Sequence, residues 1–208
     1  MVRFYLLSAL LVLALDPRLY AQDIQAKTND GRSVILKADG TWQYAGQKEP
    51  LAGDDLRYYK KPASSTASLA LKSDKMTIWY NPTTWIQQQS DDPTKMIFAH
   101  KDGDVYALII AERMAISEDA LKAIAIKNAR NVASDVNIVF EEHRIVNGVN
   151  LLCLKMVCTI QGIELIYYAY YYAGKAGTLQ VITYTSPNLL GEYEQQMSDL
   201  LNGTIIKE

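Results

Sequence analysis

The sequence predicts an α+β fold in which a single antiparallel sheet is flanked by helices as an α/β/α sandwich, with a small β-meander before it. Between Val136 and Thr185, turn residues divide the chain into four runs, which predicts an antiparallel meander of four strands. Two stretches, near residues 117–133 and 187–203, instead carry apolar residues at helical spacing. The chain has 208 residues, which is enough for about one domain with its own core.

The first 21 residues have the layout of a cleavable signal peptide. Arg3 precedes an apolar run from Phe4 to Leu15, and Ala21 supplies the small residue expected before the cleavage site. The run is shorter than the roughly 20 residues that a membrane-spanning helix needs. We therefore expect an exported protein, periplasmic or secreted, with no transmembrane span after cleavage. An uncleaved membrane anchor is the alternative.

Residues 22–45 are expected to form a small three-stranded β module. Apolar and polar residues alternate there, and the pairs Asp30-Gly31 and Asp39-Gly40 mark two turns. This stretch resembles a short "DGR...DGTW" module of exported bacterial proteins. A sheet of this size buries too little apolar surface to fold well alone, so we expect it to dock on the main domain or on a partner.

Residues 46–74 are rich in Gly, Lys, Pro, Asp and Ser, which predicts a linker, and the main domain is expected to occupy residues 75–208. Its predicted order is three strands, a helix, four strands and a helix. Ser117 is the expected N-cap of the first helix. The apolar face of that helix is predicted to consist of Leu121, Ile124, Ala125, Asn128 and Val132.

The order of elements over residues 75–206, with an early Tyr80-Asn81-Pro82…Trp85 element and a closing helix, resembles the PsbP and Mog family of α/β/α sandwiches. That family also includes the DcrB-like exported proteins. The resemblance implies the sandwich fold. It also implies binding rather than catalysis, since the family contains photosystem extrinsic subunits and a partner of a small GTPase. No functional residue of the family can be matched to a position of this sequence.

Charge and motifs narrow the classes of function. The formal net charge of −2 does not suggest a nucleic-acid partner. The sequence contains no Gly-x-Ser-x-Gly elbow, no EF-hand pattern and no phosphate-binding glycine loop. We therefore predict no catalytic residue, no metal ligand and no cofactor. Four pairs of carboxylates occur, at Asp54-Asp55, Asp91-Asp92, Asp102 with Asp104, and Glu141-Glu142. The first three fall in predicted turns or linkers, where Asp is favoured for its hydrogen bonds to the backbone.

Cys153 and Cys158 lie on one predicted strand, five residues apart. That spacing separates them by about 16 Å and turns them to opposite faces of the sheet. A disulfide needs Cα atoms within about 7 Å, so we do not expect the two to pair. The expected role is that of two small buried side chains. The alternative, a nucleophile made of Cys153 and His143, is disfavoured because a buried thiol is a poor nucleophile.

Tyrosine is unusually frequent, with 14 residues against 3 phenylalanines. On the predicted strand that contains residues 167–172, Tyr168, Tyr170 and Tyr172 share one face with Glu164. This is the more polar face, so these three tyrosines are the candidate partner-binding residues. The alternative is that a helix or the N-terminal module covers them, and that they belong to the core.

These observations predict an exported, non-enzymatic binding or accessory protein whose partner is an unknown protein or a small ligand of the cell envelope. The alternative is a small envelope hydrolase or transferase with a dispersed active site. A deep polar pocket that holds His100 or His143 beside a carboxylate would favour the alternative.

Overall fold

The computed structural model describes residues 24–28, 33–36, 42–44, 56–72, 74–92 and 94–207. The chain divides into two compact units, Met1–Glu49 and Pro50–Glu208. The expected signal peptide, residues 1–21, lies outside the described residues. Among the helices that are described, none is both long enough and apolar enough to cross a membrane.

The first unit contains a three-stranded antiparallel sheet with the order β1-β2-β3. Its strands are β1 (Ile24–Lys27), β2 (Ser33–Leu36) and β3 (Trp42–Tyr44). Both Asp-Gly turns expected in the N-terminal module lie outside the described residues, and the module as a separate domain stays a prediction.

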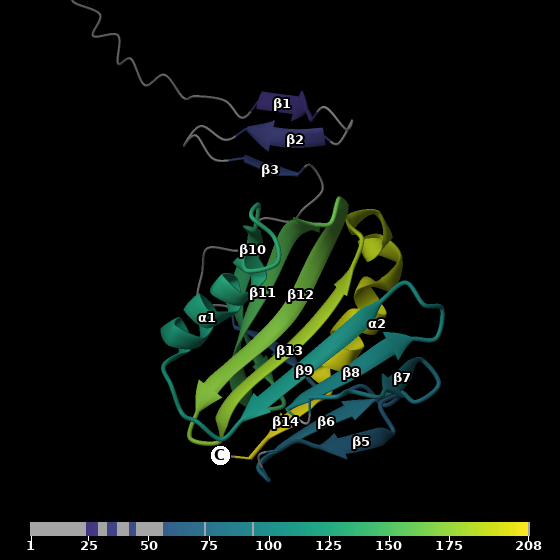
Figure 1. Ribbon diagram of the computed structural model, residues 1–208, viewed down its shortest axis with the longest axis vertical. Helices are drawn as coiled ribbons and strands as arrows, with labels where there is room; N and C mark the ends of the chain where they lie inside the picture. The colour runs from purple at the N-terminus through teal and green to yellow at the C-terminus, as the bar shows by residue number, and fades with distance from the viewer. Residues whose placement is uncertain are drawn as a thin grey trace, which may run out of the picture. The chain divides into compact units, whose positions relative to one another are not determined.

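The second unit is built on an eight-stranded sheet with the order β4-β10-β11-β12-β13-β9-β8-β7 (Figure 1). The predicted hairpin and the predicted four-stranded meander are both present, as β8–β9 and β10–β13. The strands are β4 (Arg57–Tyr59), β7 (Trp85–Gln88), β8 (Lys95–His100), β9 (Tyr106–Glu112), β10 (Asn137–Val146), β11 (Val149–Ile160), β12 (Ile163–Gly174) and β13 (Gly177–Thr185).

Two helices lie on opposite faces of this sheet, with α1 (Glu118–Arg130) in front and α2 (Leu190–Asn202) behind it in Figure 1. The Ser117 side chain accepts a hydrogen bond from the Ala120 amide at 3.2 Å, which confirms the predicted N-cap. A short 3-10 turn, η1 (Pro187–Leu189), leads into α2. The layers of the expected sandwich are therefore present.

The prediction of a single antiparallel sheet is wrong in two respects. First, β14 (Thr204–Ile206), β6 (Met76–Tyr80) and β5 (Ala67–Ala70) form a separate three-stranded sheet with the order β14-β6-β5. Second, β4 pairs in parallel with β10. The physical reason for the first error is that β6 pairs with the segment that follows α2, so it leaves the main sheet.

Two of these short strands, β4 and β5, lie within the stretch 46–74 that the composition favours as a linker. Their backbones are held by β10 and β6, which are distant in sequence. In addition, the Lys61 ammonium lies 4.8 Å from the centre of the Trp79 ring. Tertiary pairing therefore outweighs the low apolar density of this stretch.

Candidate functional site

The two faces of the large sheet are covered unequally. On the α2 face, the side chains of α2 and of the β14-β6-β5 sheet join one large core cluster, which includes Met76, Phe98 and Met197. On the other face, α1 packs with Leu121 and Ala125 against β11 and β12. A helix is about 10 Å wide and strands are spaced about 4.8 Å apart, so one helix covers only about two strands.

No described helix lies in front of β13, β9, β8 and β7 on the α1 face (Figure 1). Eight apolar residues lie on that face of the four strands, and all of them are partly or well exposed. The same face also carries the polar Gln88, Lys95 and Gln180. Tyr106 has 39% of its surface exposed and Ile86 has 52%. The other apolar residues are Ile97, Ala99, Leu108, Ile110, Ile182 and Tyr184. An apolar sheet surface therefore continues beyond the helix.

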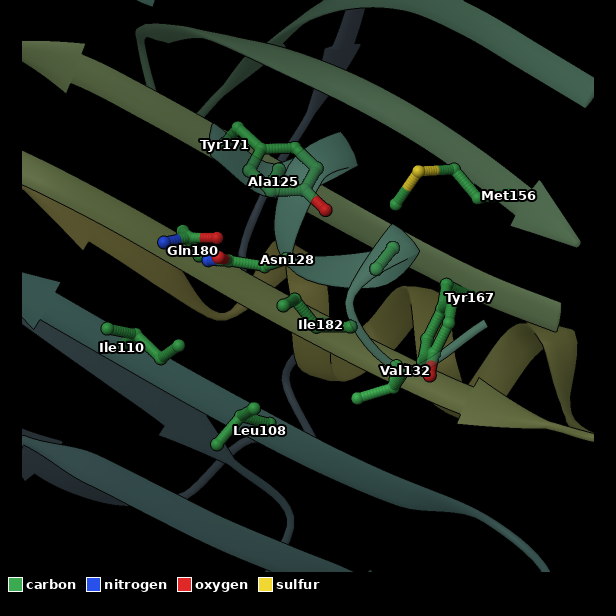
Figure 2. A pocket seen from close by; sticks show the side chains of 11 residues that line it. Leu108, Ile110, Ala125, Asn128, Val132, Met156, Tyr167, Tyr171, Gln180 and Ile182 are labelled. Atoms are coloured by element: carbon green, nitrogen blue, oxygen red, sulfur yellow. The ribbon is translucent and has the colours of Figure 1, made fainter. Parts of the chain in front are cut away.

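A pocket of about 180 Å³, here called the α1 groove, lies where α1 meets this uncovered surface (Figure 2). The wall on the helix side is formed by Ala125, Asn128 and Ala129 of α1 and by Val132, which follows the helix. Its floor comes from four adjacent strands and is formed by Leu108, Ile110, Met156, Tyr167, Tyr171, Gln180 and Ile182. The lining is thus mostly apolar, with a few polar groups, as is typical of ligand sites.

The sequence of α1 explains why a groove is present. Leu121 is 2% exposed and fills the space under the first half of the helix, whereas the second half presents the small side chains of Ala125 and Ala129. The predicted apolar face is only partly confirmed, because Ile124 and Val132 are 41% and 58% exposed. The second half of the helix still packs on the sheet through Ala125, Ile126 and Ala129, and its small side chains border the groove.

Two polar side chains lie buried on the groove floor, and the hydroxyl of one of them has no partner among the described residues. Tyr171 is 1% exposed, and its hydroxyl has no hydrogen-bond partner among the described residues. Figure 2 shows this hydroxyl pointing toward the middle of the lining side chains. Gln180, which is 6% exposed, is paired directly with Tyr171 across β12 and β13.

The unpaired hydroxyl is unusual and costly. A buried hydroxyl without a partner destabilises a protein by about 1–3 kcal/mol, and such groups are few in folded proteins. Burial, together with the neighbouring Cys158 thiol, also raises the pKa of Tyr167. Burial raises the pKa of Tyr171, so its hydroxyl is a neutral group that can both donate and accept.

The three tyrosines expected to bind a partner lie on the opposite face. Tyr168, Tyr170 and Tyr172 are 3%, 1% and 4% exposed, within the core cluster that α2 completes. The structure therefore has the arrangement that we gave as the alternative, in which a helix covers these rings. No partner can reach them while α2 is in place, and their role in binding stays a prediction.

Sequence reasoning missed Arg144, which is 5% exposed. Its guanidinium donates hydrogen bonds to the hydroxyls of Tyr168 and Tyr170, the second at 3.0 Å, and it pairs with the carboxylate of Glu142. It also lies 4.8 Å from the centre of the Tyr59 ring. One feature of the sequence indicates that Arg144 is buried. Alternation along the strand places it on the same face as the apolar Phe140 and Val146. These contacts occupy the cation, which indicates a structural role.

Both histidines lie beside carboxylates, but neither lines the α1 groove. His100 is buried against the rings of Trp85 and Tyr193, and its Nδ1 lies 3.5 Å from a carboxylate oxygen of Asp102. His143 pairs at 2.7 Å with Glu118, in an exposed contact between β10 and α1. A second pocket, of about 30 Å³, has no histidine in its lining either.

The cysteines lie on opposite faces of the sheet, as the strand spacing predicts. Cys153 belongs to the α2-side core, and Cys158 belongs to a cluster with Met156 on the α1 side. Burial raises the pKa of the Cys153 thiol to about 12. His143 pairs in register with Leu152, so it points to the face opposite Cys153. This geometry rules out the nucleophile pair that we gave as an alternative.

The acidic residues do not gather into a metal site. Among the described residues, no group of three or more His, Cys, Asp or Glu side chains could hold an ion. Asp92 accepts hydrogen bonds from the amide and the hydroxyl of Thr94, which is the predicted turn chemistry, and these bonds lower its pKa. Asp54 and Asp55 lie outside the described residues.

Comparisons with known proteins place the fold. No protein-family model matches the chain, and no curated protein matches its sequence. The structure is similar to the solution structure of cyanobacterial PsbP (CyanoP) from Synechocystis sp. PCC 6803, with a TM-score of 0.52 and 9% identity, over 70% of this chain and 95% of that one. A Bacteroides thetaiotaomicron structure matches with a TM-score of 0.50 and 10% identity, over 69% of this chain and 49% of that one. The second unit therefore has a mixed α+β, PsbP-like fold.

Proposed function

We propose that the chain is a non-enzymatic binding protein that works outside the cytoplasm and binds an apolar ligand in the α1 groove. Export rests on the signal-peptide layout of residues 1–21. Binding rather than catalysis is what the PsbP-like resemblance implies. The two pockets described above also do not bring a histidine and a carboxylate together, which is the feature that would favour the hydrolase or transferase alternative.

The half-covered sheet is the observation that supports the proposal. The second small sheet completes the cover on the α2 face, whereas on the α1 face one helix leaves a continuous apolar surface. Exposed apolar surface that borders a pocket is typical of binding sites in soluble proteins. The alanines at positions 125 and 129 hold the groove open, since larger apolar residues there would close it.

Binding of a neutral apolar dye tests this proposal. N-phenyl-1-naphthylamine, whose fluorescence rises in apolar surroundings, is expected to bind the wild type saturably. Ala129→Phe places a large ring in the groove and should weaken binding by about tenfold or more, which corresponds to about 1.4 kcal/mol. The matched control is Ala123→Phe, on the exposed side of the same helix, which should bind the dye like the wild type.

Two results would contradict the proposal. One is a wild type that does not bind the dye. The other is an equal effect of the two phenylalanine substitutions. Urea unfolding of both variants separates a blocked groove from a disrupted helix, because a blocked groove leaves the unfolding transition cooperative.

A further inference from the structure

We infer that the α1 groove selects small, uncharged molecules that consist of one apolar ring or short chain and one hydroxyl or amide group. This inference rests on the proposed function and names the ligand class. The hydroxyl of Tyr171 and the amide of Gln180 are the recognising groups. They face the same groove from adjacent positions on β12 and β13.

The polar groups of the floor call for a ligand that hydrogen-bonds. Tyr171 and Gln180 are both more than nine-tenths buried, and the Tyr171 hydroxyl has no hydrogen-bond partner among the described residues. A ligand hydroxyl or amide, which both donates and accepts, could satisfy both groups at once. A purely apolar ligand would leave the Tyr171 hydroxyl unpaired and would keep the cost of its burial.

The charge of the lining disfavours ions. None of the eleven lining side chains is a Lys, Arg, His, Asp or Glu. Burial also keeps the Tyr171 phenol neutral by raising its pKa. A carboxylate or an ammonium group would lose its hydration in this groove without gaining a partner of opposite charge. The expected ligand is therefore uncharged at its buried end.

The volume limits the apolar part. The groove holds about 180 Å³. An apolar cavity of about 150 Å³ is known to hold benzene, whereas sites for drug-sized ligands begin at about 300 Å³. The buried part of the ligand is therefore about the size of one six-membered ring with a small substituent. Longer molecules would extend along the uncovered face of β13 and β9.

Three probes with the same p-tolyl body separate these contributions. They are p-cresol, which carries a hydroxyl, p-xylene, which carries a methyl group in its place, and the anion p-toluate. Displacement of N-phenyl-1-naphthylamine by each probe gives its affinity for the wild-type chain. We expect p-cresol to bind about tenfold more tightly than p-xylene, and p-toluate to bind more weakly than either.

The variant Tyr171→Phe removes only the hydroxyl. It should lower the affinity for p-cresol about tenfold and leave the affinity for p-xylene unchanged. Tyr184→Phe is the matched control, because Tyr184 lies on the same sheet face but does not line the groove. As a second readout, Tyr171→Phe without ligand should need the same or a higher urea concentration to unfold, since it loses an unpartnered group.

Several results would overturn the inference. They are equal binding of p-cresol and p-xylene, preferential binding of p-toluate, or p-cresol binding that Tyr171→Phe leaves unchanged. Sedimentation as a dimer that excludes p-cresol would show that a second copy fills the groove. If the dye binds and Ala129→Phe blocks it while the three probes fail to discriminate, the ligand class is wrong but the proposed function stands. If the dye itself does not bind, both fail.

Discussion

The buried guanidinium of Arg144 connects three strands of the large sheet. It belongs to β10, hydrogen-bonds to Tyr168 and Tyr170 on β12, and lies over the ring of Tyr59 on β4. Replacing it by methionine keeps much of the volume but leaves Glu142, whose side chain is 15% exposed, without this cation. We expect Arg144→Met to lower the free energy of unfolding by about 3 kcal/mol, measured by urea denaturation.

Arg57 supplies the control for this experiment. It also faces Glu142, at 3.8 Å, but 41% of its side chain is exposed. An exposed pair of this kind contributes little, so Arg57→Met should cost less than about 1 kcal/mol. Equal losses in the two variants would show that burial of Arg144 is not what makes its pairing important.

The tyrosines show what sequence can and cannot supply at the scale of single residues. Period-two alternation places Tyr168, Tyr170 and Tyr172 on one face, and the structure confirms that grouping. Glu164 lies on the same face at the start of β12 and is exposed. Its presence made the whole face look more polar than the covered part of it is. Whether a helix covers this face depends on contacts between β12 and α2, which lie far apart in the sequence. Local sequence patterns do not show such contacts.

At the scale of elements, Gly203 joins α2 to the second small sheet. A Cβ atom at this position would lie 1.8 Å from the backbone oxygen of Trp79, on β6. The amide of Trp79 in turn donates a hydrogen bond of 2.9 Å to the Gly203 carbonyl. Gly203→Ala therefore forces the two backbones apart. We expect it to destabilise the protein by about 2 kcal/mol or more in urea denaturation, because overpacking forces backbone shifts.

Gly191 lies in the same helix and gives the matched comparison. No atom is within 4 Å of a Cβ built there. Alanine is favoured over glycine in a helix by about 0.5–1 kcal/mol, so Gly191→Ala should be neutral or stabilising. If both alanine variants behaved alike, close approach of the backbones would not explain the requirement for Gly203.

Element length decides which parts of this fold the sequence can predict. The helices α1 and α2 each span 13 residues, and β10 to β13 span 9 to 12, so each forms a long run that turn residues or caps delimit in the sequence. The strands β4 and β14 have three residues each and carry almost no periodic signal. They exist because distant strands pair with them. The α1 groove was missed for a related reason, since it depends on how far one helix reaches across the sheet.

At the scale of the whole molecule, burial of ionisable groups ties stability to alkaline pH. Burial raises the pKa of the Tyr170 and Tyr171 phenols, and it raises the pKa of the Cys153 thiol to about 12. In an unfolded chain, tyrosine ionises near pH 10 and cysteine near about 8.5. A group whose folded pKa is raised contributes stability that is complete below the unfolded pKa and is lost as pH rises toward the folded pKa.

We therefore expect the free energy of unfolding to fall steeply between about pH 9 and pH 12. Each such group adds a slope of about 1.4 kcal/mol per pH unit in the range where it is ionised only in the unfolded chain. Urea denaturation at about pH 7, 9 and 11 measures this slope, and Tyr171→Phe should reduce it by one group's share. A stability that stays constant to about pH 11, while phenolate absorbance develops in the folded protein, would contradict the expectation. It would show that water reaches these tyrosines without unfolding.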